Sequence, residues 1–310
     1  MNQLATFLTG IAIGQPQAYH NMQVYPLHIQ NGHDRKYRTL DEAMNAKEVE
    51  IKEVSEGGRV PTLSVHNTGA LPILLVVGEE LVGAKQNRVL NTSLLVPATS
   101  DLEIPVSCVE RGRWSYQSRG FTPSGTSSSH YSLRKAQTES VTARMLVNSD
   151  AHFAADQSAV WREVDRKISS HGTPSPTSAL KDVYDQTSDQ LKEYLDAFAT
   201  PEAQGVLVAI NGRIVGGDLF DHAETLRTLW PKLMRIYALD AVEHKTEAAE
   251  PTADAKQFLE SAQNAKDETY DSVGLGKDVR LTSDQVTGSG LLWDDKLIHA
   301  SLFSAQGMNA

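Results

Sequence analysis

Cysteine is almost missing from this chain, and so are a net positive charge and long apolar runs. The single cysteine, Cys108, rules out an intramolecular disulfide, so nothing marks an oxidising compartment. No apolar run approaches the roughly 20 residues that a membrane-spanning helix needs. A formal net charge of -10 argues against general binding to nucleic acid or to an anionic membrane, because both need a positive surface. We expect a cytoplasmic protein with neither partner.

The familiar catalytic signatures are missing as well. The chain has no phosphate loop of the Gly-x-x-x-x-Gly-Lys-Ser/Thr type, no dinucleotide-binding glycine fingerprint, no Gly-x-Ser-x-Gly elbow, no His-Glu-x-x-His and no paired-cysteine motif. These absences argue against the common hydrolase, kinase and zinc mechanisms. The sequence therefore names no cofactor and no metal site, and it leaves the reaction open.

Short apolar segments dominate the first half of the chain. Strands are predicted where apolar residues alternate or form a short continuous run, over residues 22–29, 49–54, 61–66 and 71–77. Their regular spacing suggests a sandwich or jelly-roll-like antiparallel sheet. Thr39 stands three residues before Glu42, which is a capping-box pattern and predicts a short helix over residues 39–45.

The second half mixes helical and strand patterns. Helical spacing covers residues 156–169, 178–198 and 223–239, and Asn211-Gly212 predicts a hairpin between residues 205–210 and 214–220. The predicted fold class is therefore α+β. We expect a β-rich domain over residues 1–150 and a mixed helix and strand half over residues 151–310, which can pack with the first as one unit.

The apolar stretch from Leu71 to Trp114 gives way to charge in two places, GEELVGAKQNR at residues 78–88 and ERGRW at residues 110–114. Between them, residues 90–96 and 102–108 alternate as the two strands of a hairpin. Keeping their apolar residues on one face sets Leu90 opposite Cys108 and Arg88 opposite Glu110. We predict an ion pair between Arg88 and Glu110 at the mouth of a pocket.

The charged residues around this pair suggest an anion site. Arginine offers a planar two-pronged contact to phosphate or carboxylate, and lysine offers a compact charge. The predicted ligand-binding residues are Lys85, Gln86, Asn87, Arg88, Arg111 and Arg113, where the two amides would add hydrogen bonds to a sugar or base. The alternative is a solvated set of ion pairs with neighbouring glutamates.

Carboxylates accompany these cations. Glu80 and Glu110 are the candidate general bases, since a carboxylate at the edge of an apolar core has a pKa that burial raises and an adjacent arginine lowers. The alternative is that both simply balance the cations. Cys108 alternates with core residues and is interpreted as a small apolar side chain, not a nucleophile. Asp218, Asp221 and His222 are of the types that ligate a metal, but Asp221 or its neighbour stands where a helix N-cap is expected, and we favour the cap.

Residues 115–135 are rich in serine and glycine and show no periodicity. A loop of this length is typical of a lid, a binding loop or a disordered segment. The pattern leaves two interpretations open, a lid that closes over an anion and disorder.

The block GEELVGAKQNR, followed by VPA, IPVSCVE and RGRW, resembles the signature of the ADP-ribosylglycohydrolase and rhodanese-phosphatase associated protein domain family. The resemblance implies a role around ADP-ribose or related nucleotide metabolites. Two functions are consistent with it: a protein that binds, and can process, a small anionic metabolite, and a non-catalytic module that associates with a partner enzyme.

Overall fold

The chain folds into two compact units that interleave along the sequence. The computed structural model describes residues 3–29, 34–148, 152–245 and 254–306. One unit consists of Met1–Arg35, Asp189–Asp271 and Gly276–Ala310, and the other consists of Lys36–Ser188 and Ser272–Leu275. We call them the sheet unit and the barrel unit. The second is thus an insertion into the first, which differs from the division expected near residue 150.

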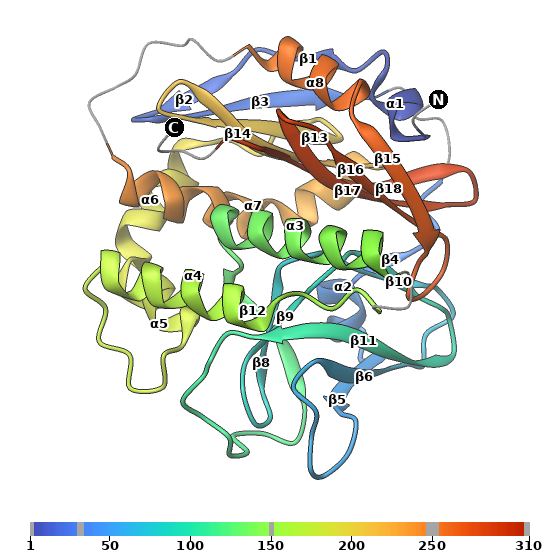
Figure 1. Cartoon of the computed structure of the whole chain (residues 1–310), viewed down its shortest axis with the longest axis vertical. Coiled ribbons are helices and arrows are strands. Elements are labelled where there is room, and N and C mark those ends of the chain that lie inside the picture. Colours follow the sequence, from blue (N-terminus) through green and yellow to red (C-terminus); the bar gives the residue numbers. More distant parts are fainter. Residues whose placement is uncertain (1–2, 30–33, 149–151, 246–253, 307–310) are drawn as a thin grey trace. The chain divides into compact units, whose positions relative to one another are not determined.

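The sheet unit is built on a nine-stranded antiparallel sheet. Its strands are β1 (Ala12–Ile13), β2 (Gln17–Tyr19), β3 (Met22–His28), β13 (Gly205–Ile210), β14 (Arg213–Phe220), β15 (Lys266–Asp271), β16 (Lys277–Thr282), β17 (Val286–Trp293) and β18 (Lys296–Ser304). Their order is β1-β3-β13-β14-β18-β17-β16-β15, with β2 also paired to β3. Strand β3, blue in Figure 1, thus pairs with β13 from much later in the chain.

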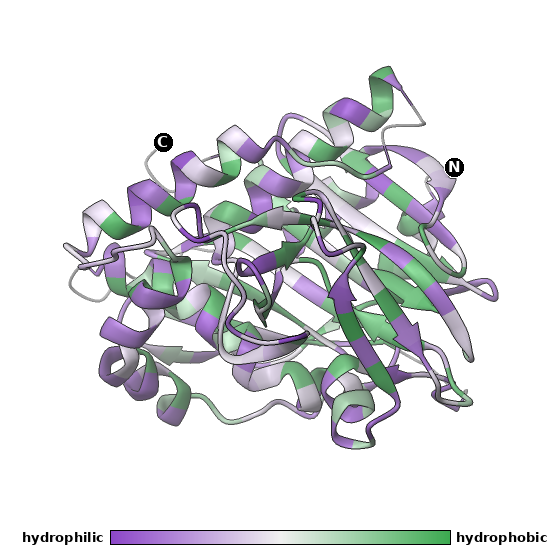
Figure 2. Ribbon diagram, turned by 90° about the horizontal axis from the view of Figure 1, so that it is seen from below, coloured by the Kyte–Doolittle hydropathy of each residue, from purple (hydrophilic) through white to green (hydrophobic). Residues whose placement is uncertain are grey.

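Apolar residues on one face of this sheet pack against two short helices. Leu4 and Leu8 of α1 (Gln3–Leu8) and Phe258 and Leu259 of α8 (Ala255–Gln263) join the same buried cluster as the inward residues of the strands. Figure 2 shows the corresponding hydropathy: hydrophilic and hydrophobic residues alternate along the helices, and the strands carry longer hydrophobic stretches. Burial of such surface contributes about 25 cal/mol per Å² of apolar area.

The hairpin of β13 and β14 in the sheet unit follows from its turn residues. The predicted hairpin is confirmed, because Asn211 and Gly212 take φ values of 51° and 73° between β13 and β14. Positive φ at both turn residues is what a tight hairpin of this twist requires.

The helix α7 (Ala223–Glu243) continues through Pro231. The helix predicted over residues 178–198 is instead divided at Thr187 into α5 (Leu180–Gln186) and α6 (Ser188–Ala197).

The barrel unit contains a closed barrel of six strands. Their order is β11-β6-β5-β12-β8-β9, and a further sheet joins β10, β7 and β4. The bounds are β4 (Arg38–Thr39), β5 (Val49–Glu53), β6 (Thr62–Asn67), β7 (Ile73–Leu75), β8 (Glu79–Gly83), β9 (Arg88–Leu90), β10 (Leu94–Val96), β11 (Ser100–Cys108) and β12 (Phe121–Ser128). The α+β class and the strand-rich first half are confirmed, with a closed barrel in place of the suggested sandwich.

Helices complete this unit: α2 (Leu40–Asn45), α3 (Tyr131–Val147), α4 (Gln157–Ser170) and α5. The capping box of α2 is confirmed, because the Thr39 hydroxyl accepts from the Glu42 backbone N–H and the Glu42 carboxylate accepts from the Thr39 N–H. Side chains alternate between core and exterior along the strands, so Ile51, Val65 and Leu81 fill the interior. One end of this interior carries the charged residues considered next.

Residues 115–135 are mostly regular structure, neither a long lid nor a disordered segment. Residues 115–120 form a loop, after which β12 closes the barrel and α3 begins at Tyr131. The sequence of β12 does not alternate between apolar and polar residues, because the pairing of this strand with β8 is irregular between Pro123 and Ser128. An irregularity of this kind removes the period that marks a strand.

Candidate functional site

The charged block folds around the tight connection between β8 and β9. Gly83 ends β8 with a φ of 126°, and a Cβ there would lie 2.5 Å from the backbone oxygen of Gly120. Only glycine fits this position. Leu81 and Leu90 face the barrel core, so Arg88, two residues before Leu90, extends the same inward row to the end of the barrel.

The predicted hairpin register is wrong. Leu90 lies opposite Val106 and Arg88 lies opposite Cys108, two residues away from the prediction. The predicted strand over residues 90–96 is also interrupted, and β10 pairs with β7. At this interruption the Asn91 amide donates to the Phe153 backbone oxygen, and the Ser93 hydroxyl accepts from the Val77 N–H.

The predicted ion pair between Arg88 and Glu110 is therefore absent, and Glu110 pairs with Arg113. Two parallel hydrogen bonds join them, Arg113 Nε to Glu110 Oε1 at 2.8 Å and Nη2 to Oε2 at 2.6 Å. Glu110 also accepts from the Thr177 hydroxyl at 3.0 Å and from the Asn87 N–H at 3.1 Å. A carboxylate has about four lone-pair directions, so these contacts occupy all of them.

Arg113 is saturated in the same way. Its other contacts are to oxygens at 2.7–3.3 Å, namely the backbone oxygens of Gly83, Ala84 and Ser115 and the side-chain oxygen of Asn87. All five guanidinium N–H groups thus have acceptors. We call the pair Glu110 and Arg113 the clamp, because it ties the connection between β8 and β9 to the segment after β11. Its geometry favours a structural role for both residues.

Arg88 presents the opposite situation. Its side chain is fully buried, yet only Nη1 makes hydrogen bonds, to the Gln86 side chain at 3.0 Å and the Asn87 backbone oxygen at 3.4 Å. Within the described part of the chain, Nε and Nη2 have no acceptor at hydrogen-bond distance. Its nearest ion-pair partner is Glu53 on β5, 3.9 Å from Nη2. Burial lowers the pKa of Arg88, and the Glu53 carboxylate acts in the opposite direction.

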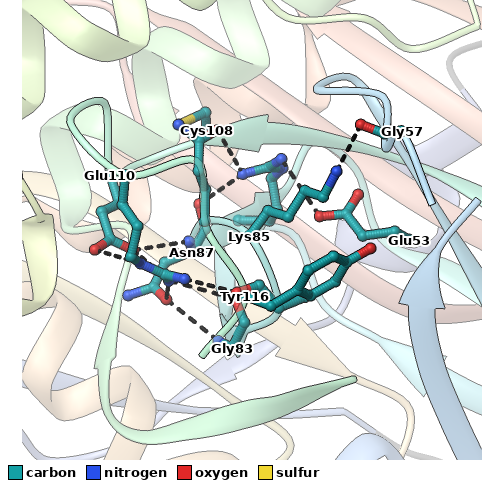
Figure 3. A network of polar contacts seen from close by, with 12 residues as sticks. Glu53, Gly57, Gly83, Lys85, Asn87, Cys108, Glu110 and Tyr116 are labelled. Atoms are coloured by element: carbon teal, nitrogen blue, oxygen red, sulfur yellow. Dashed lines mark hydrogen bonds and ion pairs between the residues drawn. The ribbon is translucent and has the colours of Figure 1, made fainter. Parts of the chain in front are cut away.

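Glu53 mirrors this state. Its side chain is nearly buried, and neither carboxylate oxygen has a donor at hydrogen-bond distance among the described residues. Buried polar groups are almost always hydrogen-bonded, and each exception calls for an explanation. Figure 3 shows Glu53 and Glu110 on opposite sides of this network, with Lys85 and Asn87 between them.

Lys85 sits beside this pair, held by oxygens and aromatic rings. Its ammonium donates to the backbone oxygens of Glu56 and Gly57 at 2.5 and 2.8 Å. It also lies 5.1 Å from the ring centroids of both Trp114 and Tyr116. Contacts between a cation and ring faces are attractive at this distance. Lys85 thus fastens the turn after β5 to residues 114–116.

We call Glu53, Lys85, Arg88, Cys108, Trp114 and Tyr116 the barrel-end cluster. Cys108 is buried opposite Arg88, and burial raises the pKa of its thiol, which fits the predicted role as a small apolar residue. Of the predicted ligand-binding residues, Lys85, Gln86 and Arg88 meet here. Asn87 and Arg113 belong to the clamp region, and Arg111 is half exposed and bonded to Asp165 of α4 at 3.1 Å.

Glu80 leaves β8 on the other face from Leu81, outside the barrel interior. The side chain is buried, and its oxygens have no partner within hydrogen-bond distance among the described residues. Burial raises the pKa of Glu80 to about 7, although nearby Ser127, the charge of Lys181 and nearby Asn87 oppose this. Glu80 and Arg88 therefore lie on opposite faces of the strands that carry them.

Sequence reasoning missed Glu53, Trp114 and Tyr116. Glu53 had a usable signal. Val49, Ile51 and Glu53 are alternate residues of one strand, so Glu53 is expected on the same inward face as the other two. Trp114 had one as well, because it ends the charged block ERGRW, whereas Tyr116 had none, since it lies in a loop without periodicity. Asp218 accepts from the hydroxyls of Tyr237 and Ser301 within the sheet unit, and no group of three or more metal-ligating side chains occurs among the described residues.

The fold and the site define an α+β protein with a six-stranded barrel whose end holds buried, incompletely hydrogen-bonded charges. The chain belongs to the ARG and Rhodanese-Phosphatase-superfamily-associated Protein domain family, whose model matches residues 10–303. No curated protein and no solved structure matches the chain. Within the described residues, no helix is long and apolar enough to cross a membrane.

Proposed function

We propose that this protein binds a small anionic metabolite at the barrel-end cluster, with Arg88 as the anion receptor. One observation carries the proposal: Arg88 is fully buried while its Nε and Nη2 groups find no acceptor among the described residues. These groups lie along one edge of the planar guanidinium, which matches two oxygens of a phosphate or carboxylate. Leaving such donors unmatched costs about 1–3 kcal/mol, which a bound anion offsets.

The metabolite that we propose is ADP-ribose or a related nucleotide. Support comes from the family, whose description associates its members with ADP-ribosylglycohydrolases. Two acids were candidate bases for a chemical step. Glu110 has no lone-pair direction left, whereas Glu80 has a pKa raised by burial to about 7 and is suited to proton transfer. Because Glu80 leaves the strand on the other face from Arg88's cluster, the proposal is for binding.

Calorimetric titration with ADP-ribose, ADP, NAD and inorganic phosphate tests the proposal. Arg88→Lys keeps a positive charge but loses the planar fork, so we expect at least about a tenfold loss of affinity. Arg111→Lys is the matched control, because Arg111 is half exposed and pairs with Asp165. This variant should bind the ligand with the affinity of the parent protein. A folded Arg88→Lys variant that binds as tightly as the parent would refute the assignment, and so would a parent protein that binds none of these compounds.

The second candidate is a module that docks onto a partner enzyme. It is favoured by the exposure of Trp114 and Tyr116, at 48% and 52%, because large aromatic residues dominate protein interfaces. The partner that the family description suggests is an ADP-ribosylglycohydrolase. Co-elution of the two purified proteins, abolished by Trp114→Ala and preserved by Arg88→Lys, would support this function over the first.

A further inference from the structure

The barrel-end cluster contains groups suited to all three parts of a nucleotide. Resting on the proposed function, we propose that the site selects nucleotides over simple phosphates and sugar phosphates. In this arrangement Arg88 binds the anionic group, Glu53 accepts from sugar hydroxyls, and Trp114, with Tyr116 beside it, stacks on the base. Each role follows from a separate observation on the described residues.

Trp114 covers Arg88. The centre of its ring lies 5.7 Å from the guanidinium carbon, and the same ring contacts the Lys85 ammonium. Arg88 is fully buried, so in this proposal the ring moves aside to let a ligand reach the guanidinium. About half of Trp114 and half of Tyr116 face solvent, so a wide aromatic surface is exposed beside Lys85 and Arg88. Aromatic rings of this kind stack on any nucleobase, since every base has a π face.

The backbone around Trp114 is fixed, so the movement belongs to its side chain. Arg113 of the clamp donates to the Ser115 backbone oxygen at 3.0 Å. Two residues further on, the Gln117 N–H donates to the Ala84 oxygen at 2.9 Å. Trp114 lies directly before these two anchored points and next to Arg113 of the clamp, and it has no backbone hydrogen bond of its own among those of the described residues. Rotation of one side chain can thus open Arg88 while the loop keeps its place.

Glu53 explains why a bare anion suits the cluster poorly. An anion that binds to Arg88 comes close to the Glu53 carboxylate, which lies 3.9 Å from Nη2, and like charges repel. A ligand that also carries hydroxyl groups satisfies the two Glu53 oxygens, as a carboxylate does for ribose in dinucleotide-binding folds. When a sugar stands next to the anionic group, its hydroxyls donate to the Glu53 carboxylate, and these hydrogen bonds offset the repulsion between the two negative charges.

Calorimetry with ADP-ribose, ribose 5-phosphate and inorganic phosphate separates the three roles. The parent should prefer ADP-ribose over ribose 5-phosphate by about tenfold or more, the contribution of one stacked base. Trp114→Leu should remove most of that preference while ribose 5-phosphate keeps its affinity. Trp293→Leu makes the same change at a tryptophan of β17, outside the barrel unit, and is the matched control, with the parent's preference unchanged. Glu53→Gln should strengthen binding of inorganic phosphate and weaken that of ribose 5-phosphate.

The outcomes distinguish this inference from the proposed function. If the parent binds ribose 5-phosphate as tightly as ADP-ribose, or if Trp114→Leu keeps the full preference, nucleotide selection is overturned while anion binding at Arg88 survives. If none of the three compounds binds to the parent, both fail. Circular dichroism and the thermal midpoint of each variant show that it is folded, so a loss of binding reports on the site.

Discussion

Arg88 and Arg113 are both buried arginines, but they differ in how many N–H groups find an acceptor. Arg113 uses all five, whereas Arg88 leaves Nε and Nη2 without one among the described residues. The first pattern is that of a structural residue, because any ligand would have to displace existing bonds. The second pattern supports the receptor role that we propose for Arg88. This contrast assigns different roles to two residues that look alike in the sequence.

Removal of the clamp should destabilise the fold. Arg113→Ala leaves the buried Glu110 carboxylate unpaired, so we expect a loss of about 3 kcal/mol or more in the free energy of unfolding, measured with urea. The double variant Glu110→Ala with Arg113→Ala should cost less than the sum of the single changes. Arg111→Ala, at an exposed ion pair, should change stability by less than about 1 kcal/mol. Additive single effects would contradict the clamp.

Glu80 should make stability depend on pH in an unusual direction. Its pKa is raised from 4.5 to about 7 in the folded state, so the folded state binds the proton more tightly than the unfolded chain. Its contribution to stability is fully present below pH 4.5 and is lost as the pH rises to about 7. Glu80→Gln removes this titration, so the variant should gain stability relative to the parent between pH 4 and pH 8, on the order of 3 kcal/mol.

Urea unfolding at pH 4, 6 and 8 measures this gain. The comparison uses the difference between variant and parent at each pH, so that the other titrating groups cancel. A difference that stays constant over the whole range would contradict the buried acid.

At the scale of elements, local signals were predictable and long-range pairing was not. The capping box of α2 and the Asn211-Gly212 turn depend on neighbouring residues alone, and both predictions are confirmed. The hairpin through residues 90–96 failed because alternation says which face a residue takes, not which strand it pairs with. The site shared this failure, since Arg88 met Glu53 from a strand far away in sequence.

The capping box should contribute measurably to α2. Thr39→Ala removes the oxygen that accepts from the Glu42 N–H, so we expect a loss of about 1 kcal/mol in unfolding free energy. Thr39→Ser keeps the hydroxyl and should stay within a few tenths of a kcal/mol of the parent. Equal losses in the two variants would show that the methyl group of Thr39, not the cap, carries the effect.

At the scale of the whole molecule, the barrel unit is one nearly continuous piece of the chain. All six barrel strands lie within Lys36–Ser188. The fragment 36–188 should therefore fold alone, with dispersed amide signals in NMR spectra and a cooperative thermal transition. The fragment 1–271 lacks β16, β17 and β18, which lie between β14 and β15, so its sheet unit should not form. A disordered fragment 36–188 would contradict the division into units.

The interleaved sheet also has a consequence during protein synthesis. Strand β3 leaves the ribosome early, but its neighbour β13 follows only after the whole barrel segment, which at 5–20 residues per second takes roughly ten seconds or more. For that time β3 is a nascent apolar segment that invites pairing with other chains. Pro26 lies within β3 and has no N–H to donate. The unpaired nascent strand is therefore a poor template for aggregation.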